Sequence, residues 1–300
     1  MDRSPAGATK IKRILWAVNP FENQRAIRGY AVKALTQILE RTDAMVQPFY
    51  LLNLMEWDEG VASRRGKIDE LVQAAARALT KAIQGVYSER MLPPVILPCN
   101  SGSLKRMVDM LISYATIERV QLIVANTSGD SGLERFLHGS FTETLASRSR
   151  IPVLIVGSRA QQIHSLQHIL YSFKNQTEND QSFRRVICMA QQLRAKITLV
   201  PDQESTRAKR RFEAWSRWAK GHGVSVRLQF ARARGLVELA HFDQVGLVVA
   251  DSFERHLVQN LPCPIWLSIR PEGRVQMPKA KVQVQALEKA ELVINFFSPA

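Results

Sequence analysis

Strand-like segments recur in pairs along this chain, and this internal repetition constrains the fold more than any single motif. One apolar segment begins Arg13-Ile-Leu-Trp-Ala-Val, and a similar segment begins His168-Ile-Leu-Tyr-Ser-Phe. A second pair closes each half, with Ile151-Pro-Val-Leu-Ile-Val matched by Cys263-Pro-Ile-Trp-Leu-Ser-Ile. Matched segments in the same order indicate a repeat of one structural unit.

A third pair, Leu122-Ile-Val-Ala and Leu247-Val-Val-Ala, precedes the closing segments and keeps the same order. The polar stretch from Gly157 to Ser165 separates the two copies. Three hundred residues suit two domains of ordinary size. The expected units are residues 11–158, residues 165–270 and a C-terminal tail, residues 271–300.

Strands and helices alternate within each copy. Ile14 to Val18 is a short apolar run, typical of a strand that is covered on both faces. The next apolar residues, from Ala26 to Ile38, recur at helical spacing. This alternation predicts an α/β fold of two tandem open parallel sheets, each in three layers of the Rossmann-like kind.

The charge balance is strongly basic, with a formal net charge of +14, and the second half carries most of it. Residues 159–270 hold 17 Lys and Arg against 9 Asp and Glu. Such a field attracts anions in general, among them nucleotides, nucleic acids and acidic proteins. On one expected helix, Arg and Lys residues alternate with Phe212, Trp215 and Trp218. The aromatic spacing favours a buried stripe beneath a solvated basic face over a surface that contacts single-stranded nucleic acid.

Other features narrow the functional class. No apolar stretch reaches the length of a membrane span, no signal peptide is expected, and the three cysteines are widely spaced, so we expect a cytoplasmic protein. The histidines show no metal-binding spacing, and no nucleophile set for an enzyme is visible. We therefore expect a protein that is not an enzyme and at most hydrolyses ATP slowly.

The segment from Asn126 to Thr142 is the one that carries chemistry. It follows an expected buried strand, and ligands of open parallel sheets bind at the carboxyl ends of strands. Gly139 and Ser140 precede an expected helix, whose first N–H groups can bind phosphate. The spacing alone is a weak signal, since a glycine-containing turn followed by a helix cap has the same composition.

This segment resembles the signature of universal stress proteins, G-x2-G-x9-G-[ST]. Gly129, nine intervening residues and then Gly139-Ser140 match its second and third elements. The resemblance covers roughly residues 11–270, with a specific motif only in the first copy. It implies an adenine nucleotide alpha-hydrolase-like fold and ATP, with or without Mg²⁺, as the ligand of the first domain only. The nucleotide-binding residues that it implies are Ala17, Val18, Asn19, Asn126, Gly129, Gly139, Ser140, Phe141 and Thr142, with Leu51 to Asn53 framing the adenosine.

Two positions depart from the signature. Asn126 replaces its first glycine, and Asn19 replaces the acidic residue that typically ends the first strand of the family. Asn accepts a left-handed backbone more readily than other non-glycine residues, so Asn126 is expected to preserve the turn, although its side chain crowds the ligand. Asn19 can still form hydrogen bonds with a base or ribose, but it carries no charge.

The second copy lacks this segment. From Ala125 to Pro152 there are 27 positions, whereas from Ala250 to Pro264 there are 14. The 13 missing positions are about the size of the phosphate loop. The second copy is therefore expected to be a degenerate universal-stress-protein domain with a structural or partner-binding role.

Two classes of function remain open. The first is a tandem universal stress protein that binds ATP and regulates a stress response through a partner. The second is an interaction protein that binds no nucleotide and docks an acidic protein or RNA, without sequence specificity, through its basic second domain. The apolar residues between Leu287 and Phe297 predict that the tail packs across the junction of the repeats, onto its own domain, or onto a second chain in a homodimer.

Overall fold

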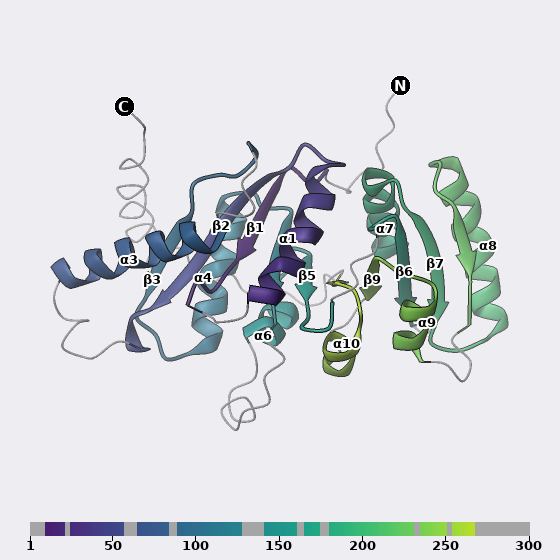
Figure 1. Ribbon diagram of the computed structural model, residues 1–300. Helices are drawn as coiled ribbons and strands as arrows, with labels where there is room; N and C mark the ends of the chain where they lie inside the picture. Colours follow the sequence, from purple (N-terminus) through teal and green to yellow (C-terminus); the bar gives the residue numbers. More distant parts are fainter. Residues whose placement is uncertain are drawn as a thin grey trace.

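The computed structural model of this chain describes residues 10–21, 25–56, 65–83, 89–127, 141–160, 165–174, 180–230, 235–250 and 254–267. Strands and helices alternate throughout this part of the chain, as the sequence predicts (Figure 1). None of the described helices combines the length and the apolar character that a membrane crossing needs.

The first half contains five strands and the helices that connect them. Its elements are β1 (Arg13–Ala17), α1 (Arg25–Leu39), β2 (Met45–Asn53), the 3-10 helix η1 (Leu54–Glu56), α3 (Arg65–Ile83), β3 (Val95–Cys99), α4 (Leu104–Ile117), β4 (Leu122–Asn126), α6 (Phe141–Arg148) and β5 (Val153–Val156). The predicted strand at Ile14 to Val18 and the predicted helix from Ala26 to Ile38 are present as β1 and α1, with ends within one residue of the prediction.

The second half has the same order of elements in a shorter chain. Its elements are β6 (His168–Phe173), α7 (Asp180–Leu193), β7 (Lys196–Pro201), α8 (Thr206–Gly221), β8 (Val226–Leu228), α9 (Leu236–Phe242), β9 (Leu247–Ala250), α10 (Arg255–Asn260) and β10 (Ile265–Leu267). Strand β8 is shorter than the alternating run from Val224 to Phe230 suggests. It is the last strand of the sheet, so only its central residues pair with β7.

All ten strands belong to one sheet, in the order β3-β2-β1-β4-β5-β10-β9-β6-β7-β8. Each half therefore places its strands in the same relative order: third, second, first, fourth, fifth. Every pair is parallel apart from β5 and β10, which are antiparallel and place Leu154 opposite Trp266. The predicted α/β fold with parallel strands is confirmed, but the two sheets that the sequence predicts form one continuous sheet, joined through β5 and β10.

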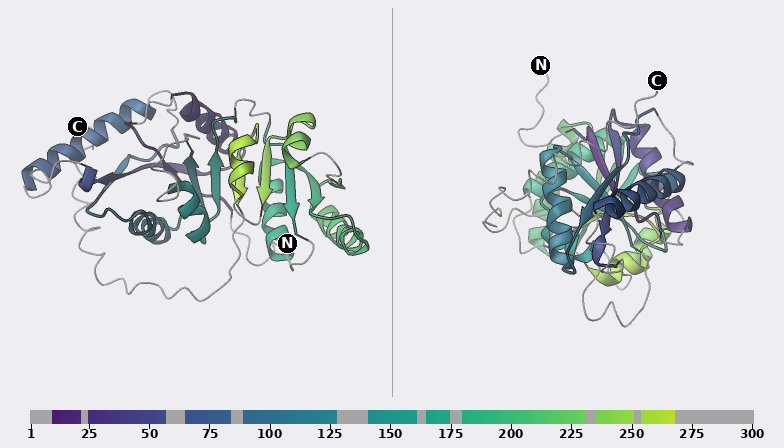
Figure 2. Two further views of the ribbon diagram at one scale, coloured as in Figure 1. Left: turned by 90° about the horizontal axis from the view of Figure 1, so that it is seen from below. Right: turned by 90° about the vertical axis from the view of Figure 1, so that its left-hand side faces the viewer.

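The helices cover both faces of this sheet and form three layers. One core packs α1, α3, α7 and α8 against side chains such as Trp16, Leu154 and Tyr171. The other core packs α4, α6, α9 and α10 against the opposite face. Because the sheet twists strongly between its halves, α1 and α3 lie on one side in Figure 2 whereas α7 and α8 lie on the other. Both cores continue across the junction, so the halves share their hydrophobic interior.

Candidate functional site at the carboxyl ends of β1 and β4

Strands β1 and β4 are neighbours in the first half, with Ala17 opposite Ala125 near their carboxyl ends. Strand β1 continues into α1 on one face of the sheet, whereas β4 leads to α6 on the other face. This is the topological switch point of the first half. Since the two connections leave in opposite directions, the ends of β1 and β4 are where an open parallel sheet binds ligands.

A hydrogen bond joins the end of β4 to the start of α6. The Oγ1 hydroxyl of Thr142 donates to the backbone carbonyl of Asn126 at 3.1 Å. Thr142 is only 5% exposed, so this bond is largely shielded from water. The bond fixes both ends of the segment that contains Gly129, Gly139 and Ser140, which themselves lie outside the described residues.

Asn126 is the last residue of β4 and has an ordinary strand backbone. It lies opposite Val156 of β5 and is absent from the described non-glycine residues with positive φ, which are Arg119, Arg194 and Gln244. The expectation that Asn126 preserves a left-handed turn is therefore wrong, because the strand continues through this position. A glycine here would provide room for a ligand rather than backbone freedom.

The side chain of Asn126 has a buried carbonyl oxygen, Oδ1, that finds no hydrogen-bond donor among the described residues. A buried acceptor without a donor costs about 1–3 kcal/mol. A ribose hydroxyl or an adenine amino group would supply the missing donor. If the amide is rotated by 180°, its Nδ2 takes that place and suits a phosphate oxygen instead. The position thus fits a bound nucleotide in either orientation of the amide.

The residues after β1 form a turn beside this site. The backbone N–H of Val18 donates to the carbonyl of Phe49 at 2.9 Å, which extends the pairing of β1 with β2. Asn19 is exposed, and its Oδ1 accepts from the backbone N–H of Phe21 at 3.1 Å. The Asn19 side chain therefore stabilises the turn through its oxygen, and its amide NH₂ remains the group that it can offer to a ligand.

The remaining residues that the resemblance implies offer backbone groups to a ligand or border the site. The ring of Phe141 packs against the core beneath α4 and α6, so Phe141 offers a ligand its backbone N–H at the start of α6. At the end of β2, Asn53 is 8% exposed and its Oδ1 accepts from the backbone N–H of Met55 at 3.2 Å. The described side chains at the ends of β1, β2 and β4 thus offer amides and hydroxyls.

The corresponding place in the second half has a shorter connection. Ser172 of β6 lies opposite Ala250 of β9, as Ala17 lies opposite Ala125 in the first half. Only residues 251–254 separate β9 from α10, whereas residues 127–140 separate β4 from α6. Helix α10 itself was not expected from the sequence, because the segment after Ala250 has no clear helical periodicity.

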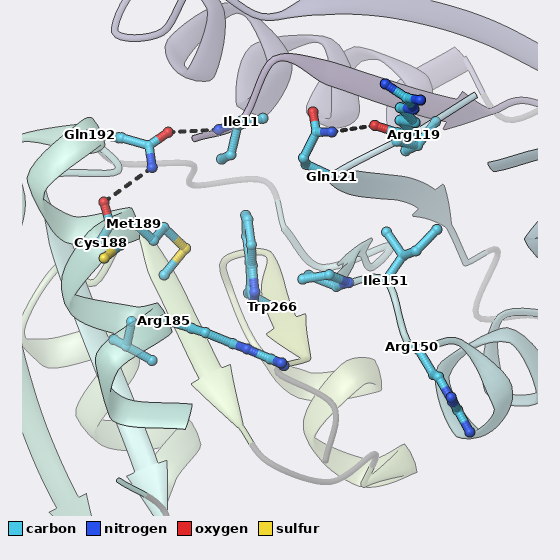
Figure 3. A pocket seen from close by; sticks show the side chains of 13 residues that line it. Ile11, Arg119, Gln121, Arg150, Ile151, Arg185, Cys188, Met189, Gln192 and Trp266 are labelled. Atoms are coloured by element: carbon cyan, nitrogen blue, oxygen red, sulfur yellow. Dashed lines mark hydrogen bonds between the residues drawn. The ribbon is translucent and has the colours of Figure 1, made fainter. Parts of the chain in front are cut away.

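A pocket at the junction of the two halves was also missed by sequence reasoning. Its volume is about 310 Å³, and it lies between the amino-terminal ends of β4 and β5 and helix α7 (Figure 3). Trp266 stands at its centre and Arg185 extends beneath it, whereas Arg150 points away. Its residues come from both halves, so no pattern within one half marks it.

Metal chemistry finds no support in the described part of the chain, where no three His, Cys, Asp or Glu side chains gather. The three cysteines, Cys99, Cys188 and Cys263, are buried and unpaired by disulfides. Burial raises the pKa of the Cys263 thiol to about 12, and it raises the pKa of the other two thiols as well. They are small packing residues rather than nucleophiles.

Comparisons with known proteins agree with this architecture. A universal stress protein from Archaeoglobus fulgidus DSM 4304 has a TM-score of 0.58 at 13% identity, covering 88% of this chain and 98% of that chain. A protein described as a universal stress protein from Pseudomonas aeruginosa UCBPP-PA14 has a TM-score of 0.50 at 12% identity, covering 96% and 99%. No curated protein matches the chain.

At these identities the solved structures show a shared fold that extends over both halves. The family itself is shown for the first half by its sequence. Residues 10–157 match the sequence profile described as the universal stress protein family, and this match includes both ends of the segment from Asn126 to Thr142. The first half of the chain, residues 10–157, is thus a domain of the universal stress protein family.

Proposed function

We propose that the first half binds an adenine nucleotide, ATP in particular, at the carboxyl ends of β1 and β4, and that the protein acts by binding. The observation that carries this proposal is the hydrogen bond from Thr142 to the carbonyl of Asn126 at 3.1 Å. It holds together the two ends of a glycine-containing segment at the switch point, which is the arrangement that a phosphate-binding loop needs.

In this proposal, different described residues contact the phosphates, the ribose and the adenosine. The start of α6, directly after Gly139 and Ser140, offers backbone N–H groups to the phosphates. The buried amide of Asn126 lies where β4 ends and takes the ribose or the first phosphate. Asn19 and Asn53 border the adenosine with uncharged amides. Mg²⁺, where it accompanies the nucleotide, would be held mainly by the phosphates, because no acidic cluster lies among the described residues.

This arrangement suits binding better than turnover. A hydrolytic site needs a group that takes a proton from the attacking water, and the described side chains at the ends of β1, β2 and β4 offer amides and hydroxyls instead. We therefore propose a regulatory protein of the stress response rather than an enzyme. Nucleotide binding orders the segment from Asn126 to Thr142 and changes a surface that a partner recognises. The second half, a degenerate copy with a short β9–α10 connection, binds no nucleotide.

Calorimetric titration of the full chain with ATP tests this proposal. We expect at most one site per chain, weakened by Gly139→Val and unaffected by Asp251→Ala. Thr142→Val removes the hydroxyl that ties the segment and should weaken binding about fivefold, which corresponds to one hydrogen bond. Thr144→Val is the matched control, because Thr144 lies on the same helix and its hydroxyl forms no hydrogen bond with β4 among the described residues.

Two results would contradict the proposal. If the unmodified chain shows no ATP binding in the titration, the proposed function is wrong. Binding that persists unchanged in Gly139→Val, or two equivalent sites per chain, places the nucleotide elsewhere. Native mass spectrometry of the purified protein provides an independent measurement, because a tightly bound nucleotide should co-purify with a stoichiometry of one.

A further inference from the structure

A basic groove lies between the amino-terminal parts of α7 and α8, in the half that does not carry the nucleotide site. Its volume is about 580 Å³, and it is open to solvent. The residues that line it are Asp180, Phe183, Arg184, Arg207, Arg210, Arg211, Ala214, Trp215 and Trp218. Four arginines thus face one acidic side chain across this groove.

Asp180, the one acidic residue among the described residues that line the groove, already has a hydrogen-bond partner. Oδ1 of Asp180 accepts a hydrogen bond from the indole Nε1 of Trp215 at 2.8 Å. Neither Arg207 nor Arg210 forms an ion pair with a described residue, and both are exposed. The surrounding chain adds to the field, since residues 180–230 contain eleven Lys and Arg against four Asp and Glu. Arg207 and Arg210 therefore carry positive charge that no described acidic side chain neutralises.

The aromatic residues hold the arginines in place but offer little surface of their own. The guanidinium of Arg211 lies 5.5 Å from the ring centre of Trp215, and that of Arg184 lies 5.8 Å from the ring centre of Trp218. Trp215 is stacked on Phe183 with ring centres 4.2 Å apart and is only 5% exposed. Cation–π contacts of this kind restrict a guanidinium without neutralising it.

We propose that this groove binds the phosphate backbone of a nucleic-acid strand. Arginine forms paired hydrogen bonds with phosphate oxygens, and backbone contacts dominate binding that is independent of sequence. Arg207 and Arg210 are three positions apart on α8, a rise of about 4.5 Å, and Arg211 adds about 1.5 Å. This spacing distributes the charges along the groove, as a chain of phosphates requires.

A strand of nucleic acid fits this groove better than an acidic protein does. Protein interfaces usually depend on buried aromatic or aliphatic anchors. The large hydrophobic side chains that are exposed in the described chain are Phe21, Met55 and Ile117, and all three lie in the first half. Because Trp215 and Phe183 are already packed, the groove offers charge and little apolar surface. Trp218 is partly exposed, but its ring already contacts Arg184 and His222, so we expect little stacking of bases and no sequence preference.

Fluorescence anisotropy with a labelled twenty-nucleotide oligo-dT and a twenty-base-pair duplex tests the groove across a range of salt concentrations. The test variant is Arg207→Ala/Arg210→Ala. The matched control is Arg217→Ala/Lys220→Ala, which removes two exposed charges from the same helix outside the groove. All three proteins should have the same far-ultraviolet circular dichroism, because none of the replaced side chains is buried.

We expect the groove variant to bind oligo-dT about 25-fold more weakly at 0.1 M salt, with a salt slope reduced by about 1.4, as loss of two phosphate contacts predicts. The control variant should lose much less affinity, and its salt slope should change much less. Equal losses in the two variants, absence of binding to either probe, or a salt-independent affinity would overturn the proposal. A polyglutamate peptide that binds the groove more tightly than oligo-dT at the same salt concentration would overturn it in favour of an acidic protein.

Discussion

The side-chain oxygen Oε1 of Gln192, in α7, accepts a hydrogen bond from the backbone N–H of Ile11 at 2.9 Å across the junction between the halves (Figure 3). Just before β6, Oε1 of Gln37 in α1 accepts from the backbone N–H of Leu166 at 2.8 Å. Both residues of the second bond are 155 positions away from their counterparts in the first. In each half, a glutamine near the end of the first helix therefore accepts a hydrogen bond from the backbone N–H that lies two residues before the first strand of the other half.

These paired bonds should stabilise the joined sheet in equal measure. We expect Gln192→Leu and Gln37→Leu each to lower the free energy of unfolding by about 1–2 kcal/mol, because each leaves a buried N–H without an acceptor. The two bonds lie before different strands, β1 and β6, and share no residue, so their effects should add in the double variant. Urea denaturation measures the change. Gln191→Leu is the control, since its hydrogen bond to His222 is exposed; a comparable loss there would show that the junction bonds have no special role.

The sequence predicts the strands at this junction but not their pairing. Val153–Val156 and Ile265–Leu267 are fully buried, and continuous apolar runs of this kind indicate strands covered on both faces. An apolar run does not specify which strand lies beside it or in which direction. The antiparallel β5–β10 pair depends on contacts between residues more than a hundred positions apart, so it follows from the packing of two complete halves.

The candidate site shows the same division between what a motif predicts and what packing decides. Gly129 and Gly139-Ser140 identify the segment through their spacing, and the resemblance places it after β4. The sequence does not reveal that the Thr142 hydroxyl donates to Asn126, because that bond forms only when the start of α6 packs against the end of β4. The sequence also suggested a turn at Asn126, where the pairing of β4 with β5 keeps the strand extended.

Replacement of Asn126 should change affinity and stability in opposite directions. Asn126→Ala removes a buried oxygen that has no donor among the described residues, so the unliganded protein should become more stable by about 1 kcal/mol. The same change removes a hydrogen bond to the nucleotide and should weaken ATP binding about fivefold. Thermal unfolding and calorimetric titration measure the two effects. Tighter binding would show instead that Asn126 crowds the ligand where the family has a glycine.

Gly246, directly before β9, lies where the chain enters the second half. A Cβ at this position would be 2.1 Å from the backbone oxygen of Ser165 and 2.9 Å from Cα of Leu166. Gly246→Ala should therefore lower the free energy of unfolding by about 3 kcal/mol, because backbone atoms would have to move. Gly221→Ala is the control at the end of α8, where nothing lies within 4 Å, and it should change stability by less than about 1 kcal/mol. Urea denaturation compares the two, and equal effects would contradict the close approach.

A buried histidine at the start of β6 makes the stability of the second half depend on pH. His168 is 6% exposed, with its Nδ1 3.0 Å from the carbonyl of Asp243 and its Nε2 2.9 Å from the hydroxyl of Thr198. Burial lowers the pKa of His168 below its usual value of 6.5, and the nearby charges of Lys196 and Arg227 lower it further. The carbonyl and the carboxylate of Asp243 oppose this shift without reversing it.

The sign of the pH effect follows from which state binds the proton. Below pH 6.5 the unfolded chain protonates His168, whereas the folded protein keeps the ring neutral until the pH reaches its lower folded pKa. Stability should therefore fall as the pH decreases through this window, with a slope of at most about 1.4 kcal/mol per pH unit from this residue. His168→Gln should lose that part of the slope. Urea denaturation at several pH values between 5 and 8 measures the slope for both proteins. The difference in stability between them at pH 8 gives the effect of the changed packing and is subtracted. Parallel pH profiles for the two proteins would show that His168 is not the group that titrates.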